Sequence, residues 1–186
     1  METLLSLAAG LGLAAAAGFR VFVPLLALGL ATRFEAVPLS DGFAWMGSDA
    51  ALVIFATATV LEILGYYVPW VDNLLDTIAS PAAVLAGVLL TAAVLTDVDP
   101  VLRWTLAVIA GGSTSAIFQG LTAGTRGVTT LATGGLANPL VSTAEMGAST
   151  LLALLAVLVP IAALVLVVVL GWVIAKRTVW RRKAPA

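Results

Sequence analysis

Residues 16–31 read AAGFRVFVPLLALGLA, and residues 122–137 read TAGTRGVTTLATGGLA. The two stretches agree at seven of sixteen positions, whereas chance would give roughly two in a chain this rich in Ala and Leu. The least expected agreement is an arginine, which is Arg20 in the first copy and Arg126 in the second. The chain therefore carries an internal repeat, with an arginine inside a long apolar run in each copy.

The composition around this repeat is that of a protein whose solvent is lipid. Of the 186 residues, 61% are hydrophobic and 10% are charged, and the mean hydropathy is +1.12. Soluble globular domains are far more polar. We therefore predict an all-α, polytopic transmembrane helical bundle that contacts the lipid bilayer.

Apolar runs predict about five membrane crossings, because a helix needs about 20 residues to cross the hydrocarbon core. We place the crossings near residues 4–32, 48–68, 81–97, 103–137 and 147–175. The first and fourth runs are too long for a straight span and contain glycines and an arginine, so we interpret them as broken helices. The alternative, in which each broken helix is a full hairpin, gives about seven crossings.

The order of the runs predicts a single transmembrane domain over residues 1–175 with an inverted-topology repeat. Each copy is a broken helix followed by a straight one, over about 4–68 and 103–175, and the span near 81–97 turns the second copy upside down. Such repeats are typical of transporters and some channels. The alternative is a gene duplication that only builds a stable bundle.

A basic tail over residues 176–186 sets the predicted orientation. The positive-inside rule places this tail in the cytoplasm, at the inner (plasma) membrane. Five crossings then place the N-terminus outside, with Arg33 and Arg103 in cytoplasmic loops and Glu145 in an outer segment.

Residues 69–80 differ from the runs around them, because their apolar side chains fall on one helical face while Asp72 and Asp76 fall on the other. We interpret this segment as a short helix at the membrane interface. The two aspartates lie one turn apart, so they form either an outer cation or structural site or a solvated polar face.

Arg20 and Arg126 are the first candidates for a substrate-binding site. An arginine near mid-span costs about 2.5 to 3.5 kcal/mol, so each one must be compensated. Gly18 and Gly124 precede the two arginines and weaken their helices. Guanidinium groups at two helix breaks would present donors to a shared anion or polar solute. The alternative is that each arginine pairs with an acid such as Glu62, or caps freed carbonyls, and serves only folding.

Glu62, Gln119 and Thr122 complete the set of candidate substrate-binding residues. Glu62 lies well inside a straight predicted span, where it is a proton-coupling group, a counter-ion for an arginine or a residue that reaches the outer surface. Gln119 and Thr122 follow the small, polar run 111–115. That run either lines a pore or lets helices pack closely.

The missing residue types argue against several functions. The chain has no cysteine and no histidine, which removes disulfides, thiolate nucleophiles and the commonest transition-metal ligands. We expect no enzyme activity, no cofactor and no bound metal. The formal net charge of -1 gives no reason to expect nucleic acid as a partner.

Three stretches resemble a family of small bacterial multi-pass membrane proteins known as domain of unknown function 4126. They are AAGFRVFVPLLALGLA, PWVDNLLDTIASP and GLTAGTRGVTTLATGGLANP. The resemblance covers most of residues 4–160. It implies family motifs at Gly18 to Arg20, at Asp72 with Asp76, and at Ala123 to Arg126. The family has no established activity, so the resemblance bears on the fold more than on the function.

Two functional hypotheses follow from these observations. The first is a transporter or channel for a small anionic or polar solute, with its site where the two broken helices meet. The second is a noncatalytic membrane scaffold or accessory subunit. Five crossings enclose little volume, so we expect a homo-oligomer in either case.

Overall fold

The computed structural model describes residues 2–183, and it gives no description of the side chains of residues 69, 70, 72, 73, 76, 174, 175 and 177–183. Every regular element in the described residues is helical, so the predicted all-α class is confirmed. The elements are α1 (Glu2–Phe19), α2 (Phe22–Arg33), the 3-10 helix η1 (Ala44–Gly47), α3 (Asp49–Gly65), α4 (Pro69–Val94), α5 (Pro100–Leu106), the π-helical segment η2 (Ala107–Gly112), α6 (Ser113–Thr133), α7 (Asn138–Leu158) and α8 (Pro160–Lys183).

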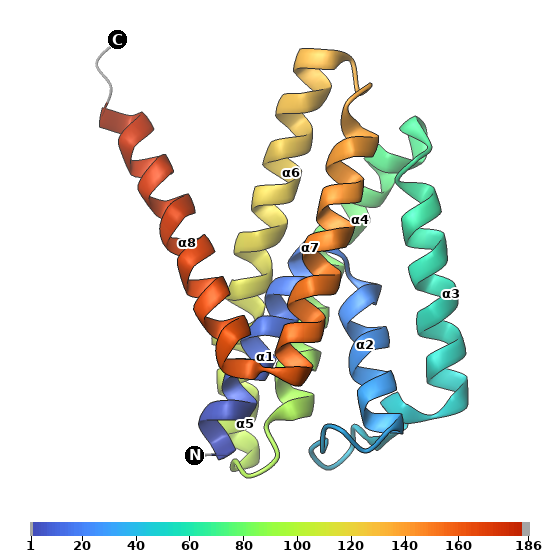
Figure 1. Cartoon of the computed structure of the whole chain (residues 1–186), viewed down its shortest axis with the longest axis vertical. Coiled ribbons are helices and arrows are strands. Elements are labelled where there is room, and N and C mark those ends of the chain that lie inside the picture. The colour runs from blue at the N-terminus through green and yellow to red at the C-terminus, as the bar shows by residue number, and fades with distance from the viewer. Residues whose placement is uncertain (1, 184–186) are drawn as a thin grey trace.

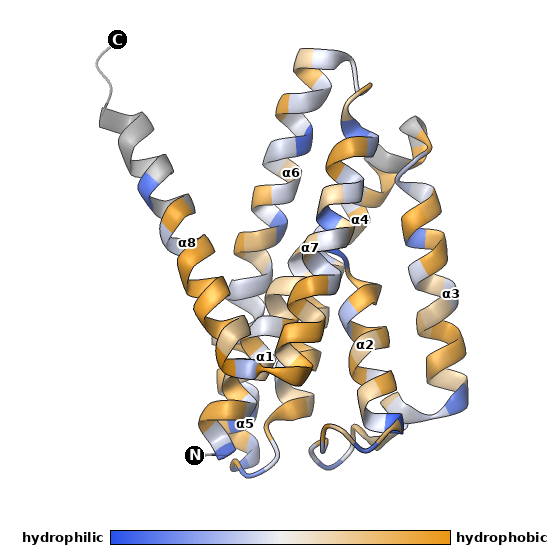
Figure 2. Cartoon of the chain, viewed as in Figure 1, coloured by the Kyte–Doolittle hydropathy of each residue, from blue (hydrophilic) through white to orange (hydrophobic). Residues whose placement is uncertain are grey.

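Four helical stretches in the described residues are long and apolar enough to cross a membrane. They are Glu2–Phe19, Thr77–Val94, Pro100–Thr133 and Asn138–Leu158. Large apolar side chains on several helices also face outward, among them Val53, Ile54 and Val168, each more than 60% exposed. Figure 2 shows apolar residues along most of the length of the helices. Outward-facing apolar helices of this length are what a membrane protein requires.

The first predicted crossing, residues 4–32, is wrong, because this run folds back as the hairpin α1–α2 (Figure 1). The start of α1 and the chain that follows α2 lie at the same end of the molecule, where Leu5, Ser6, Val37 and Pro38 line one cavity. The hairpin turns at Arg20 and Val21. Its tip lies about midway along the long axis of the molecule (Figure 1).

The break predicted in the first run is found, at Arg20 and Val21, but the break predicted in the second run is wrong, because α6 runs without interruption through Arg126. Its departure from regular α-helix comes earlier, in η2. Glycine inside a helix costs only about 1 kcal/mol, and no proline in this stretch removes a hydrogen bond. Glycines alone were therefore insufficient grounds for predicting a break.

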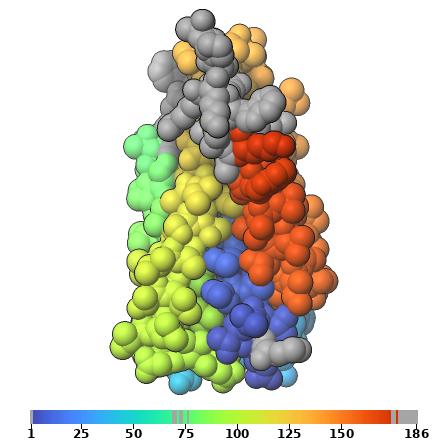
Figure 3. All heavy atoms as spheres, turned by 90° about the vertical axis from the view of Figure 1, so that its left-hand side faces the viewer, coloured from blue at the N-terminus to red at the C-terminus, as the bar shows by residue number. Residues whose placement is uncertain are grey.

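The inverted arrangement is not found in the helices that carry the two copies. Gly10 of α1 and Gly111 of η2 both lie against Thr91 of α4, and further along Gly18 of α1 lies against Phe118 of α6. α1 and the η2–α6 helix therefore run side by side in the same direction. Figure 3 shows α1 between α6 and α8 on one face of the molecule.

Prolines mark three further differences from the predicted elements. α4 continues through Pro81, so residues 69–80 are the first part of a long helix and not a separate interfacial helix. The predicted span 147–175 is divided at Pro160, where α7 ends and α8 begins. The helix predicted to start near residue 147 begins earlier, at Asn138, with Pro139 in its first turn. Proline is favoured there because the first helical N–H groups lack intrahelical partners.

These differences from the predicted elements change which charged residues lie at the same end of the molecule. The termini lie at opposite ends of the long axis, which we name the N-end and the C-end (Figure 1). α2 finishes with Arg33 at the N-end, and α5, which carries Arg103, lies there too. The prediction that Arg33 and Arg103 share a side with the basic tail is therefore wrong, because α1–α2 returns to its own side.

Gly18 and Gly124 allow a matched test of this packing. A Cβ atom on Gly18 would lie 2.5 Å from the Phe118 Cβ and 2.7 Å from the Ser115 carbonyl oxygen, whereas a Cβ on Gly124 would meet nothing within 4 Å. We expect Gly18→Leu to lower the free energy of unfolding by about 1–3 kcal/mol or more. Gly124→Leu should leave it unchanged or raise it by up to about 1 kcal/mol. Unfolding of both variants in mixed micelles, followed by circular dichroism, checks this, and equal effects would contradict the close contact of α1 with α6.

Candidate functional site

The guanidinium of Arg20 is buried at the tip of the α1–α2 hairpin and reaches across to α7. Its Nη2 donates to the carbonyl oxygen of Ser142 at 3.0 Å and to the Ser142 hydroxyl at 2.5 Å. The same nitrogen lies 3.5 Å from a carboxylate oxygen of Glu145. The arginine side chain is 0% exposed, so these contacts replace its hydration.

Arg126 of α6 contacts the same carboxylate. Its Nε lies 3.1 Å from each carboxylate oxygen of Glu145, and its Nη2 also donates to Oε2. The Cζ atoms of Arg20 and Arg126 each lie 3.9 Å from the centre of the Tyr66 ring. The two predicted arginines therefore lie together, and they share one carboxylate and one aromatic ring, which is a cation–π arrangement.

Within the described residues, Glu62 forms no direct ion pair with Arg20 or Arg126, which was one of the roles the sequence left open for it. Its two carboxylate oxygens accept hydrogen bonds from the backbone N–H groups of Val21 at 2.9 Å and Phe22 at 3.1 Å. Those donors stand at the start of α2, where no preceding turn can satisfy them. Glu62 therefore caps α2 from α3, and its negative charge lies at the positive end of that helix.

Sequence reasoning missed three members of this cluster: Tyr66, Ser142 and Glu145. The predicted crossings put Glu145 in an outer segment, because the predicted span that follows it begins near residue 147. Pro139 was the available signal, since proline favours the first turn of a helix. A helix that starts at residue 138 brings four polar residues to one face, at Asn138, Ser142, Glu145 and Ser149, and all four are buried.

Polar side chains continue from the cluster toward the C-end, between α6 and α7. Asn138 accepts from the Thr129 hydroxyl at 2.9 Å and donates to the Thr130 hydroxyl at 3.1 Å. On the other flank of Arg126, Thr122 donates to the Gln119 carbonyl oxygen at 2.9 Å, and the Gln119 amide lies 3.5 Å from the Ser80 hydroxyl of α4. Gln119 and Thr122, both predicted, are thus buried beside the cluster.

The remaining predicted site residues play different parts. Gly18 permits the close approach of α1 to α6, and Gly124 lies where nothing approaches it. Asp72 and Asp76 lie one turn apart in α4, but their side chains fall outside the described residues. In the described part of the chain, no three residues of the His, Cys, Asp or Glu type cluster as they would around a metal ion.

Arg20 has hydrogen-bond donors that are not used within the cluster. Within the described residues, the Nε and Nη1 atoms of Arg20 are buried and have no hydrogen-bond partner. A buried guanidinium N–H that has lost water and gained no acceptor is costly, and such groups are rare in native proteins. Two donors on one fixed cation are suited to an anion or to a polar group that offers oxygen.

The shared carboxylate makes a second prediction. Glu145→Gln should lower the free energy of unfolding by about 3–5 kcal/mol, because it removes the charge of the carboxylate that two buried guanidinium groups share. Arg126→Gln in the same chain should cost less than the sum of the two single changes, with a coupling energy of about 1–3 kcal/mol. Denaturant unfolding of the two single variants and the double variant measures this energy, and strictly additive losses would rule out the ion pair.

Comparisons with known proteins identify the family. A family profile for a domain of unknown function, DUF4126, matches residues 7–180, which is nearly the whole chain. Neither a search of curated proteins nor a search of solved structures returns a match. On the extent of the profile match, the chain belongs to the DUF4126 family.

Proposed function

We propose that this protein is a transporter or channel for a small anionic or polar solute, which it binds at the cluster of Arg20, Arg126, Tyr66 and Glu145. The observation that carries the proposal is the buried Arg20 guanidinium, two of whose three nitrogens, Nε and Nη1, have no hydrogen-bond partner in the described residues. In membrane proteins, ionisable residues at depth are expensive, and they mark substrate and ion pathways.

The two halves of the molecule differ in a way that supports this proposal. Toward the N-end, α1 is tightly packed, and Leu13 and the four alanines that follow it are 0% exposed. A Cβ on Gly12 would lie 2.8 Å from the Cβ atoms of Ala156 and Ala163. Toward the C-end, Thr122, Ser142 and Asn138 are polar and buried. Polar side chains thus occupy the interior from the C-end to the tip of the α1–α2 hairpin at mid-depth.

A transport cycle requires the N-end half to open. The α1–α2 hairpin is the element that closes it, and its tip carries Arg20. A solute bound to Arg20 would compete with Ser142 and Glu145 for the same guanidinium. Binding would in that way loosen the hairpin from α7, which couples occupancy to opening.

The orientation and assembly belong to the same proposal. Five basic residues, from Lys176 to Lys183, lie in the last part of α8 and its tail, so we propose that the C-end faces the cytoplasm of an inner membrane and the N-terminus faces outward. α8 leans away from the bundle (Figure 1), and its Val165, Val168 and Trp172 side chains are exposed. We propose that this apolar face joins copies into a homo-oligomer.

The second candidate function is a noncatalytic scaffold or accessory subunit. The observation that favours it is the satisfaction of most charges inside the chain, since Glu145 pairs with Arg126 and Glu62 caps α2. In this case a partner protein supplies the activity, and the arginines only hold the hairpin to α7.

Solute-dependent thermal stabilisation of the purified protein tests the first candidate. A panel of small anions, cations and neutral metabolites is screened, and we expect one anionic or polar class to raise the unfolding temperature. A ligand at 100 times its dissociation constant adds about 2.7 kcal/mol of stability. Arg20→Gln should abolish this shift and the flux of the same solute into proteoliposomes, because it removes the unpaired donors.

Two controls separate binding from folding. Arg33→Gln removes an arginine whose side chain is 55% exposed and remote from the cluster, and it should keep the shift and the flux. Thr122→Val leaves the arginines in place but removes a polar group beside them, and it should reduce flux in a fully folded protein. If no solute stabilises the wild-type protein and a stoichiometric partner co-purifies, the scaffold function is correct.

A further inference from the structure

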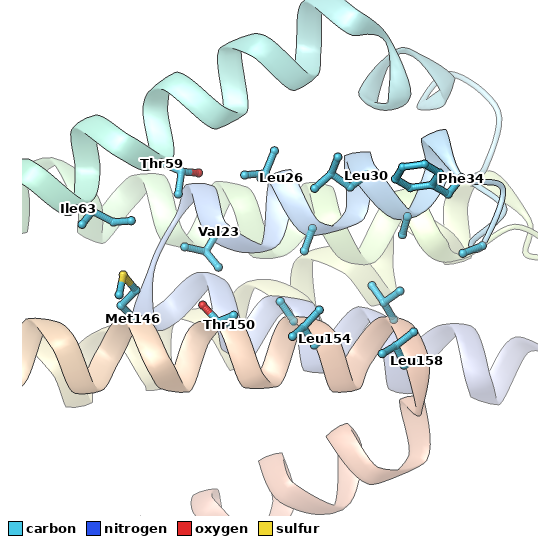
Figure 4. A pocket seen from close by; sticks show the side chains of 15 residues that line it. Val23, Leu26, Leu30, Phe34, Thr59, Ile63, Met146, Thr150, Leu154 and Leu158 are labelled. Atoms are coloured by element: carbon cyan, nitrogen blue, oxygen red, sulfur yellow. The ribbon is translucent and has the colours of Figure 1, made fainter.

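An apolar groove lies between α2 and α3 on one side and α7 on the other. Its volume is about 430 Å³, and thirteen of its fifteen lining residues are apolar, the exceptions being Thr59 and Thr150. Figure 4 shows Val23, Leu26, Leu30 and Phe34 in a row along α2, beside a second row on α7 formed by Met146, Thr150, Leu154 and Leu158. The groove is thus elongated along the two helices and is not a round cavity.

The groove extends from mid-depth to the N-end surface. At one end the groove is lined by Ile63 and Met146. Ile63 follows Glu62 in the sequence, and Met146 follows Glu145 of the buried cluster. At the other end it reaches Phe34, which follows the last residue of α2 and is 78% exposed. The eleven residue steps from Val23 to Phe34 span about 16 Å of helix. That length matches one leaflet, which is half of a hydrocarbon core about 30 Å thick.

The lining decides what kind of molecule fills this space. Water needs two to four polar partners, and the groove offers little beyond two hydroxyl groups. An empty space of this size would forfeit the van der Waals contacts of its walls. Hydrocarbon is the medium around the helices, and it satisfies an apolar wall without any polar partner.

We propose that the groove binds one acyl chain of a phospholipid from the N-end leaflet, with its phosphate beside Arg33. Arg33 is the last residue of α2, adjacent to Phe34 at the groove mouth. Its guanidinium lies 3.0 Å from Asp49, yet the arginine side chain remains 55% exposed and available to a phosphate. The bound chain joins α2 to α7 and supports the hairpin from the side opposite α1.

Photo-crosslinking in vesicles tests this proposal. The full-length protein is reconstituted into phosphatidylethanolamine and phosphatidylglycerol vesicles that contain a trace of phosphatidylethanolamine with a diazirine near the end of one acyl chain. Adducts are located by peptide mass spectrometry. We expect them to concentrate on the groove residues of α2 and α7, because a bound chain stays there while annular lipid exchanges.

A matched pair of substitutions distinguishes a bound chain from ordinary lipid contact. Ala27→Phe fills the groove and should lower its adducts about tenfold, whereas Ala144→Phe, on an exposed part of α7 outside the groove, should leave them unchanged. Arg33→Gln should reduce them less, because the apolar contacts remain. Adducts spread evenly over the groove and over α8, which does not line it, would overturn the proposal. Circular dichroism confirms that each variant is folded.

Discussion

Reversal of the chain at mid-depth is the constraint on which the rest of the structure depends. At Val21 and Phe22 the backbone donors have no helical partner, and in a membrane an unsatisfied donor costs several kcal/mol. Glu62 of α3 accepts both hydrogen bonds. Arg20, at the same turn, is fixed to α7. The hairpin, α3 and α7 are therefore stable only together, and the Glu145 carboxylate joins α6 to the same network.

The short hairpin also explains why the two halves of the molecule differ. α1 enters from the N-end and stops at mid-depth, so its alanines and glycines occupy the centre of one half only. Close packing of small residues is how helices associate in lipid, where no hydrophobic effect drives them together. In the other half, the centre is bounded by α6 and α7, whose facing residues are polar. The hairpin tip is consequently the level at which close packing of small residues around α1 gives way to an interior bounded by polar residues of α6 and α7.

Sequence predicted the all-α class and singled out the two arginines, because an unexpected arginine in an apolar run is a local signal, but it did not predict the residues that contact them. It did not predict where the chain reverses. Arg20 with Pro24 and Arg126 with Gly127 look alike as sequence, yet the first lies at a turn and the second lies in a continuous helix. The difference arises from Glu62, which caps one turn from a distance of about forty residues. Glu145 was missed for a related reason. Its burial beside the arginines requires a helix that starts at Asn138 and Pro139, before the predicted span.

We propose that the cluster binds a solute and does not only support the fold, and the distribution of its hydrogen bonds supports this proposal. A network selected for folding alone would use all its donors, or would be replaced by apolar residues of similar volume, which is often neutral or stabilising. Here Arg126 binds Glu145 through both Nε and Nη2, whereas Arg20 uses Nη2 alone. Both guanidinium groups lie over the ring of Tyr66 in a cation–π arrangement. In the proposed function, an arginine fixed in this way, with donors left over at mid-depth, would be preorganised for an acceptor that arrives from elsewhere.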